Sequence, residues 1–276
     1  MAGNAITEAH RSGGISQAVH DGLIITIRNL KRVPRIPELA IFAILQSIMF
    51  VLLFAYVFGG AIPLPGGGSY REFLIPGIFA QTVVFAAATT AIGICEDINK
   101  GLMDRFRSLP MARSAVLSGR AVFDVVYQSG ILVVLMISGL AVGWRVHTGI
   151  PEFFGGVGLL LLFVFAMSWV GIWFGTIVPT VEVANQVAFT VILPITFLSN
   201  VFVPPSTLPG FLQPVAEWNP TSTLTAATRS LWGNPNPYAS SGFPAEHPAL
   251  LTLIWIAVIV TVFAPLAVMR YRSMSR

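Results

Sequence analysis

Charged residues are scarce in this 276-residue chain, at 10 % of the total, whereas 55 % of residues are hydrophobic and the mean hydropathy is +0.77. A water-soluble fold cannot bury so large an apolar fraction. The apolar residues fall in long runs, each near the ~20 residues that a helix needs to cross the ~30 Å hydrocarbon core of a bilayer. We therefore predict an all-α membrane protein with six transmembrane helices. The predicted spans are residues 38–58, 73–94, 121–142, 156–177, 183–202 and 249–268.

Cysteine is nearly absent, because Cys95 is the only one in the chain. No intramolecular disulfide can form. The place of Cys95 at the end of the second predicted span favours a packing role over thiol chemistry. An apolar core of the kind found in cleavable signal peptides is also missing, since the first twenty residues include Glu8, His10 and Arg11. We expect the first span to act as an uncleaved insertion signal.

Lysine occurs only at Lys31 and Lys100, and neither follows a phosphate-binding glycine loop. The run of glycines at residues 66–68 resembles such a loop, but no lysine comes after it. Nucleotide binding in the Gly-x-x-x-x-Gly-Lys-Ser/Thr arrangement needs that lysine beside the backbone amides. We therefore expect no enzyme activity and no cofactor in this chain, with any ATP and Mg on a separate ATPase subunit.

Ionisable groups are rare within the predicted spans, where Glu38 and Asp124 lie close to the cytoplasmic ends and all four histidines lie outside. An ion-coupled carrier usually places such groups inside its spans, so that class is less favoured. A membrane enzyme is less favoured too, because the chain has no His-Glu-x-x-His zinc pattern, no Gly-x-Ser-x-Gly motif and no intramembrane carboxylate pair. A passive channel stays open, and no metal site is predicted.

Basic residues are distributed unevenly along the chain. Of its 16 lysines and arginines, 13 lie before the first span, between the second and third, or after the last. Such residues accumulate on the cytoplasmic side, so both termini of this multi-pass protein are predicted to be cytoplasmic. Arginine outnumbers lysine by 14 to 2, a usage typical of GC-rich bacterial genomes, and the expected location is the bacterial inner membrane. Anionic lipid and topology account for the pI of about 9.6, and nucleic acid is not an expected partner.

Two cytoplasmic stretches are predicted to be amphipathic helices. The first belongs to an N-terminal region, residues 1–36, that precedes the transmembrane domain of residues 37–276. Its apolar face, with Leu23 and Ile27, suits a membrane-surface anchor or a cytoplasmic partner. The second lies within residues 95–120, and its mixed charge suits either a cleft on a soluble motor subunit or the membrane interface.

Polar and aromatic residues form a stripe on the second predicted span and another on the fifth. Because isolated polar groups are costly in lipid, these stripes should face protein or a water-accessible cavity. Interhelical hydrogen bonding and a path for an amphipathic organic molecule both stay open. The candidate substrate path consists of Gln81, Phe85, Thr89, Gln186, Thr190 and Phe197.

Proline interrupts the apolar segment of residues 203–232, so no continuous span can form there. We predict two short helices that enter the outer leaflet and return, covered by protein. The candidate gate residues in this re-entrant segment are Phe211, Glu217, Pro220 and Arg229.

Several short motifs resemble those of one known family. Residues 96–101 (EDINKG), 106–111 (FRSLPM) and 118–120 (SGR) resemble the cytoplasmic coupling region of ABC type-2 exporter permeases, in particular the drug-resistance branch typified by the daunorubicin exporter permease. Residues 219–221 (NPT), followed by Arg229, resemble the family's late signature, although Thr223 departs from it.

This resemblance implies a half-transporter that pairs with a second permease, identical or related, and with two ATP-binding subunits. It implies export of hydrophobic, drug-like compounds, while lipid, glycolipid or polysaccharide remains the alternative cargo. The residues implied to contact the ATPase are Glu96, Asp97, Leu102, Arg105, Phe106 and Arg107.

Overall fold

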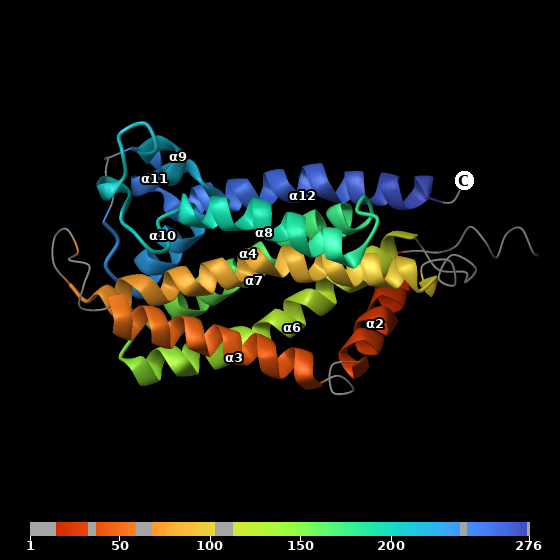
Figure 1. The fold of residues 1–276 in the computed structure, drawn as a ribbon, viewed down its shortest axis with the longest axis horizontal. Helices are drawn as coiled ribbons and strands as arrows, with labels where there is room; N and C mark the ends of the chain where they lie inside the picture. The colour runs from red at the N-terminus through yellow and green to blue at the C-terminus, as the bar shows by residue number, and fades with distance from the viewer. Residues whose placement is uncertain are drawn as a thin grey trace, which may run out of the picture.

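The computed structural model describes residues 15–32, 37–58, 64, 68–102, 113–237 and 242–274, and these form helices without any strand. Figure 1 shows the longer helices running roughly side by side, with the short helices gathered at one end. The helices are α2 (Ile15–Arg32), α3 (Pro37–Leu53) with the π-helical turn η2 (Phe54–Phe58), α4 (Tyr70–Asn99), α6 (Arg113–Val142), α7 (Ile150–Gly175), α8 (Val181–Phe197), η3 (Pro205–Thr207), α9 (Gln213–Trp218), α10 (Pro220–Trp232), α11 (Phe243–Glu246) and α12 (Pro248–Ser273).

Each predicted span coincides with a helix, and the all-α prediction is confirmed for the described residues. Four of these helices, α4, α6, α7 and α12, are long and apolar enough to cross a bilayer. The helices α3 and α8 are shorter, at 17 residues each. Helix α8 ends at Phe197, before the predicted residue 202, because the chain turns there and buries Val201 and Phe202 in the protein core.

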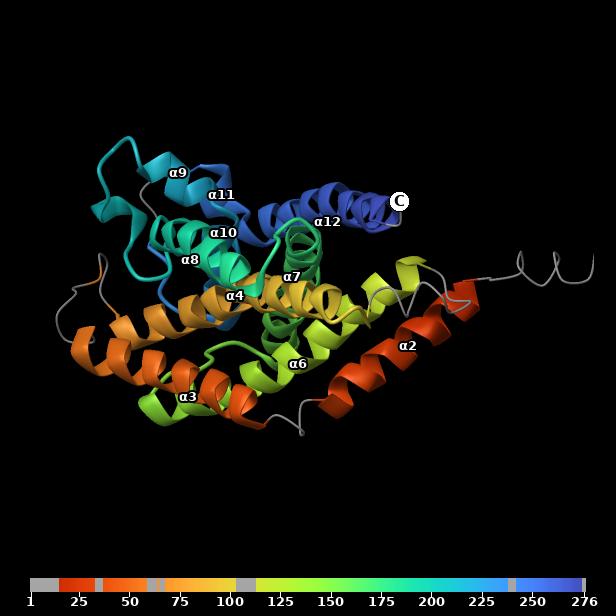
Figure 2. The same ribbon diagram turned by 45° about the vertical axis from the view of Figure 1, so that its right-hand side comes forward.

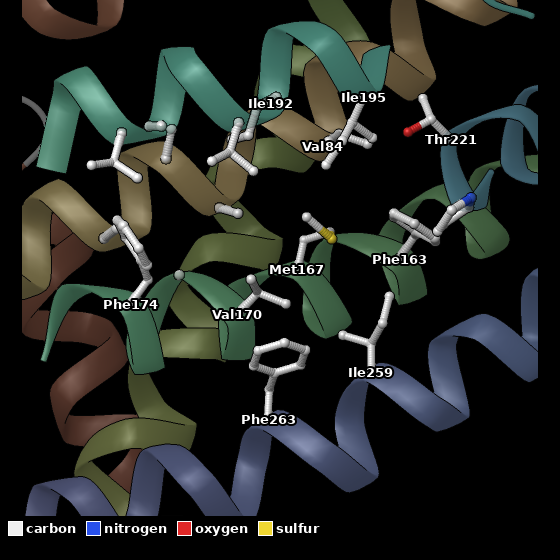
Figure 3. A pocket seen from close by; sticks show the side chains of 18 residues that line it. Val84, Phe163, Met167, Val170, Phe174, Ile192, Ile195, Thr221, Ile259 and Phe263 are labelled. Carbon is white, nitrogen blue, oxygen red and sulfur yellow. The ribbon is translucent and has the colours of Figure 1, made fainter. Parts of the chain in front are cut away.

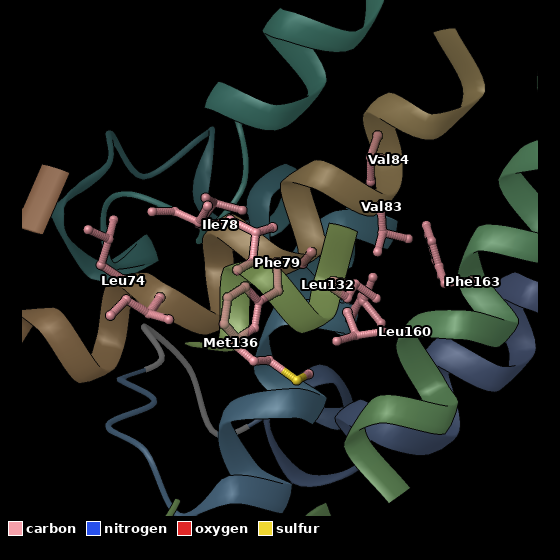
Figure 4. Close-up of a cluster of buried hydrophobic side chains, with 14 of the residues drawn as sticks. Leu74, Ile78, Phe79, Val83, Val84, Leu132, Met136, Leu160 and Phe163 are labelled. Atoms are coloured by element: carbon pink, nitrogen blue, oxygen red, sulfur yellow. The ribbon is translucent and has the colours of Figure 1, made fainter. Parts of the chain in front are cut away.

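Helix α4 lies at the centre of the bundle and packs against α6, α7, α8 and α10. In its most apolar window 72 % of residues are buried, compared with 22 % in α12. Gly171 and Gly175 of α7 let the two backbones approach, since a Cβ on Gly175 would lie 2.6 Å from the carbonyl oxygen of Ala91. Figure 4 shows the core around α4, where Phe79 and Val83 meet Leu132 of α6 and Leu160 of α7.

The predicted amphipathic helix is α2, which lies across the end of α6 opposite the short helices (Figure 1 and Figure 2). We refer to these two ends as the α2 end and the α10 end. Thr26 of α2 donates a hydrogen bond to the carbonyl oxygen of Gly119, 2.9 Å away on α6. Leu23, Ile24 and Ile27 lie on the exposed side of α2, so its apolar face is available to a membrane surface.

Candidate functional site

A cavity of about 360 Å³, which we call the polar cavity, lies among α3, α4, α6 and α8. Its wall combines aromatic rings with amide and hydroxyl groups, a composition that suits an amphipathic organic molecule. Phe85 of α4 and Phe189 of α8 both line it and contact each other edge to face, with ring centroids 6.1 Å apart. The polar side chains that line it are Gln46, Gln81, Thr82, Thr89, Tyr127, Gln128 and Asn185.

Four of the six candidate path residues line this cavity, namely Gln81, Phe85, Thr89 and Phe197. The other two, Gln186 and Thr190, are exposed on α8 and do not line it. Their role in transport stays a prediction.

Helix α8 presents a different stripe to the cavity from the one predicted, consisting of Asn185, Phe189 and Leu193 followed by Phe197. The reason is the packing of α8, because Ala184 and Ala188 lie on the buried face that contacts α4. Each residue that directly follows one of these alanines, Asn185 and Phe189, then points toward the cavity, because the two pairs are one helical turn apart. The small residues at four-residue spacing were the sequence signal for this packing face.

At the α10 end, the fully buried Arg229 joins three segments of the chain. Its Nε donates to the carbonyl oxygen of Phe73 on α4 at 2.7 Å, and its terminal nitrogens donate to those of Asn200 at 3.0 Å and Val201 at 3.1 Å. The guanidinium also lies 3.6 Å from the centroid of the Phe73 ring. These bonds compensate the cost of burying the charge.

Asn219 links α8 to α10. Its Oδ1 accepts from the amide of Thr221 at 2.8 Å and so caps α10, which begins with Pro220. Its Nδ2 donates to the carbonyl oxygen of Ile195 at 2.7 Å, in the last turn of α8. The asparagine of the predicted late signature therefore has a structural role at the junction of the two helices.

The two other candidate gate residues differ in their surroundings. Glu217 of α9 is buried, whereas Phe211 precedes α9 and is 78 % exposed. The structure thus brings Glu217, Pro220 and Arg229 into the packed α10 end and leaves Phe211 at the surface.

At the α2 end, Glu96 and Asp97 form the last turn of α4, which ends at Asn99. Gly101 then adopts a φ of +66°, a conformation that favours glycine. Asp97 is buried, and its Oδ2 lies 3.9 Å from a guanidinium nitrogen of Arg28 on α2. The predicted coupling segment therefore begins as an extension of α4 that contacts α2.

The remaining candidate coupling residues are less fully placed. Leu102 is half-buried and follows the two-residue turn after α4. Arg105, Phe106 and Arg107 lie outside the described residues.

A buried ion pair on α6 was missed by the sequence analysis. Asp124 Oδ1 lies 3.1 Å from Arg120 Nε, and its Oδ2 accepts a hydrogen bond of 2.7 Å from Thr90 on α4. Arg120 was assigned to a cytoplasmic loop and Asp124 to a span end, but both side chains are enclosed in the bundle. Their spacing of four residues along a helix was the available signal.

No group of three or more histidine, cysteine or acidic side chains that could hold a metal ion occurs in the part of the chain that the structure describes. Cys95 is buried and lies 3.7 Å from the carbonyl oxygen of Val178, consistent with packing.

These long apolar helices around a lined cavity define a helical integral membrane protein. Comparison with known proteins then identifies the family. Residues 22–231 match the family model described as "ABC-2 type transporter". The chain belongs to the ABC-2 type transporter family, whose members are the membrane subunits of transporters. The predicted resemblance is thereby confirmed.

Three relatives illustrate the similarity. A daunorubicin resistance ABC transporter permease protein, DrrB1 of Streptomyces coeruleorubidus, is 34 % identical over 83 % of this chain and 78 % of its own length. A probable doxorubicin resistance ABC transporter permease protein, DrrC of Mycobacterium tuberculosis, is 27 % identical over 89 % of this chain and 86 % of its own length. The inner membrane transport permease YhhJ of Escherichia coli is 25 % identical over 71 % of this chain but only 50 % of its own length.

Proposed function

We propose that this chain is the membrane-spanning subunit of an ATP-driven exporter that moves hydrophobic or amphipathic, drug-like compounds out across the bacterial inner membrane. The observation that carries the proposal is the polar cavity, in which aromatic rings and uncharged hydrogen-bonding groups lie together within a helical membrane domain. The printed names of two relatives, which concern daunorubicin and doxorubicin resistance, support the same cargo class.

The proposed topology has six spans, with the two 17-residue helices α3 and α8 as the first and fifth. Both termini are cytoplasmic, in keeping with the distribution of basic residues. The α2 end then faces the cytoplasm and the α10 end faces outward, with α9 and α10 as a re-entrant pair covered by protein.

Two ATP-binding subunits supply ATP and Mg in this proposal, since the sequence has no phosphate-binding lysine loop. In the proposal, these subunits contact two parts of the chain, which are helix α2 and the segment that follows α4. A second permease, identical or related, closes the exposed side of the polar cavity, where Phe189 is 47 % and Phe197 is 61 % exposed. Movement of α4 and α8 would connect the ATPase to the cavity.

The cargo is the part of the proposal that a substitution can test. Removing an aromatic contact costs about 0.5–1.5 kcal/mol, which corresponds to about a 2- to 12-fold loss of affinity. We expect Phe85→Ala and Phe197→Ala to change the ranking of resistance to daunorubicin, doxorubicin and an unrelated hydrophobic dye, with normal protein in the membrane. Drug susceptibility of cells that express each variant with its ATPase subunit measures this change.

The control is Phe154→Ala, because Phe154 is 63 % exposed, much like Phe197, but does not line the cavity. The control should keep the wild-type ranking. If all three variants keep the wild-type ranking at equal membrane levels, the polar cavity has no role in choosing the cargo. If the cavity variants change only the transport of a lipid or glycolipid, the alternative cargo is favoured.

A further inference from the structure

A second cavity, which we call the apolar groove, lies between α8 and α12 with α4 and α7 as its floor (Figure 3). Its volume is about 250 Å³. Val84, Phe163 and Met167 form part of the floor, and Ile259 and Phe263 project from α12. Thr221, at its α10 end, is the only residue with a polar side chain among the described residues that line it.

The apolar groove is separate in chemistry from the polar cavity on the other side of α4. The two cavities share Ala88, but the groove has none of the amide groups that line the polar cavity. A ligand of the groove can therefore make van der Waals contacts and very few hydrogen bonds.

Water is a poor occupant of such a site, because an apolar cavity offers too few polar partners and stays dry. An empty groove is also unfavourable, since its lining atoms lose dispersion contacts. Three of the surrounding helices, α4, α7 and α12, are candidate membrane spans. The rims continue into exposed apolar side chains, including Val191 and Ile195 on α8, so the groove is continuous with a lipid-facing surface.

We propose that the apolar groove binds an acyl chain of a membrane phospholipid between α8 and α12. The size of the groove fits this occupant. A helix with side chains is about 10–12 Å wide, too large for this space, whereas an apolar cavity of ~150 Å³ already binds benzene.

The bound chain would also support α8, which has α4 as its main packing partner among the described helices. Helix α8, together with α4, separates the two cavities, with Asn185 and Phe189 toward one and Val187 and Val191 toward the other. An acyl chain in the groove supplies contacts on the side of α8 that faces α12. The shape of the polar cavity then depends on membrane lipid.

Photolabelling of the full-length protein tests this proposal. The chain is placed in nanodiscs of phosphatidylethanolamine and phosphatidylglycerol that contain a phosphatidylcholine with a diazirine midway along one acyl chain. After irradiation, labelled residues are located by peptide mass spectrometry. We expect label on the floor residues Met167 and Val170, which line the groove and are partly exposed within it.

The variant Val191→Trp should fill the groove and reduce floor labelling by roughly fivefold or more, because close-packed space leaves no room for the acyl chain. The matched control is Val262→Trp on α12, since Val191 is 49 % and Val262 is 46 % exposed but only Val191 lines the groove. The control should leave floor labelling unchanged.

Wild-type labelling decides the matter even if a variant folds poorly. Label confined to outward side chains such as Val262, with an unlabelled floor, would overturn the proposal, as would crosslinks showing that a second copy covers the groove. Equal floor labelling in Val191→Trp and wild type would also contradict it. None of these outcomes requires ATP hydrolysis or export, so the result is independent of the proposed transport function.

Discussion

Arg229 shows how a single buried charge can join separate parts of a membrane domain. Its three hydrogen bonds reach α4 and the turn that follows α8, while its own backbone belongs to α10. Gly77 allows this approach, because a Cβ there would lie 2.7 Å from the carbonyl oxygen of Val201 and 3.2 Å from the guanidinium. The position therefore depends on the planar guanidinium as well as on its charge.

The variant Arg229→Lys should lower stability, because an ammonium cannot place donors on all three carbonyl oxygens at once. Each hydrogen bond to a charged group contributes about 1.5–3 kcal/mol, so we expect a loss of about 2 kcal/mol or more. Thermal unfolding of the purified protein in detergent measures the effect.

The control for Arg229→Lys is Arg145→Lys, since Arg145 is exposed and its guanidinium donates to the carbonyl oxygens of Leu140 and Trp144, which are close in sequence. Its effect should stay within about 0.5 kcal/mol, as for most surface substitutions. An Arg229→Lys protein as stable as wild type would show that charge alone suffices at this position.

At the scale of the helices, most of the fold could be predicted from the sequence. Long apolar runs identified the positions of the longer helices, and the 3.6-residue period placed the amphipathic face of α2. The period did not identify which face of α8 lines the polar cavity, because Gln186 and Thr190 were chosen by polarity while Ala184 and Ala188 determine the packing. Contacts between distant segments, such as that of Asp124 on α6 with Thr90 on α4, depend on tertiary packing that periodicity does not encode.

The contact between α2 and the end of α4 gives a prediction about coupling between helices. Asp97 is buried beside Arg28, so Asp97→Asn removes a charge at the junction of the two helices. We expect less transport per ATP hydrolysed by the assembled transporter, with normal insertion. Parallel assays of ATPase activity and drug uptake in proteoliposomes measure this ratio.

A matched substitution is available at the opposite end of the bundle. Glu152 is exposed in the first turn of α7, at the α10 end. Glu152→Gln also removes one negative charge, away from the proposed ATPase contact surface, and should therefore keep the wild-type ratio of transport to hydrolysis. If Asp97→Asn also keeps it, the α2–α4 junction has no part in coupling.

At the scale of the whole molecule, the chain is a membrane subunit of the ABC-2 family with two cavities on either side of α4. We propose that the exported compound occupies the polar cavity and that membrane lipid occupies the apolar groove. The α2 end, which combines the last turn of α4 with α2, is the proposed contact surface for the ATPase. In this proposal, the energy for export comes from the ATP-binding subunits and not from this chain.

Drug accumulation in proteoliposomes tests this central claim most directly. The permease is reconstituted with or without its proposed ATP-binding partner subunit, and fluorescent daunorubicin is followed against protein-free liposomes. We predict accumulation above the protein-free level only when the ATP-binding subunit and MgATP are both present. Accumulation by the permease alone under an imposed proton gradient, above that of protein-free liposomes, would contradict the account.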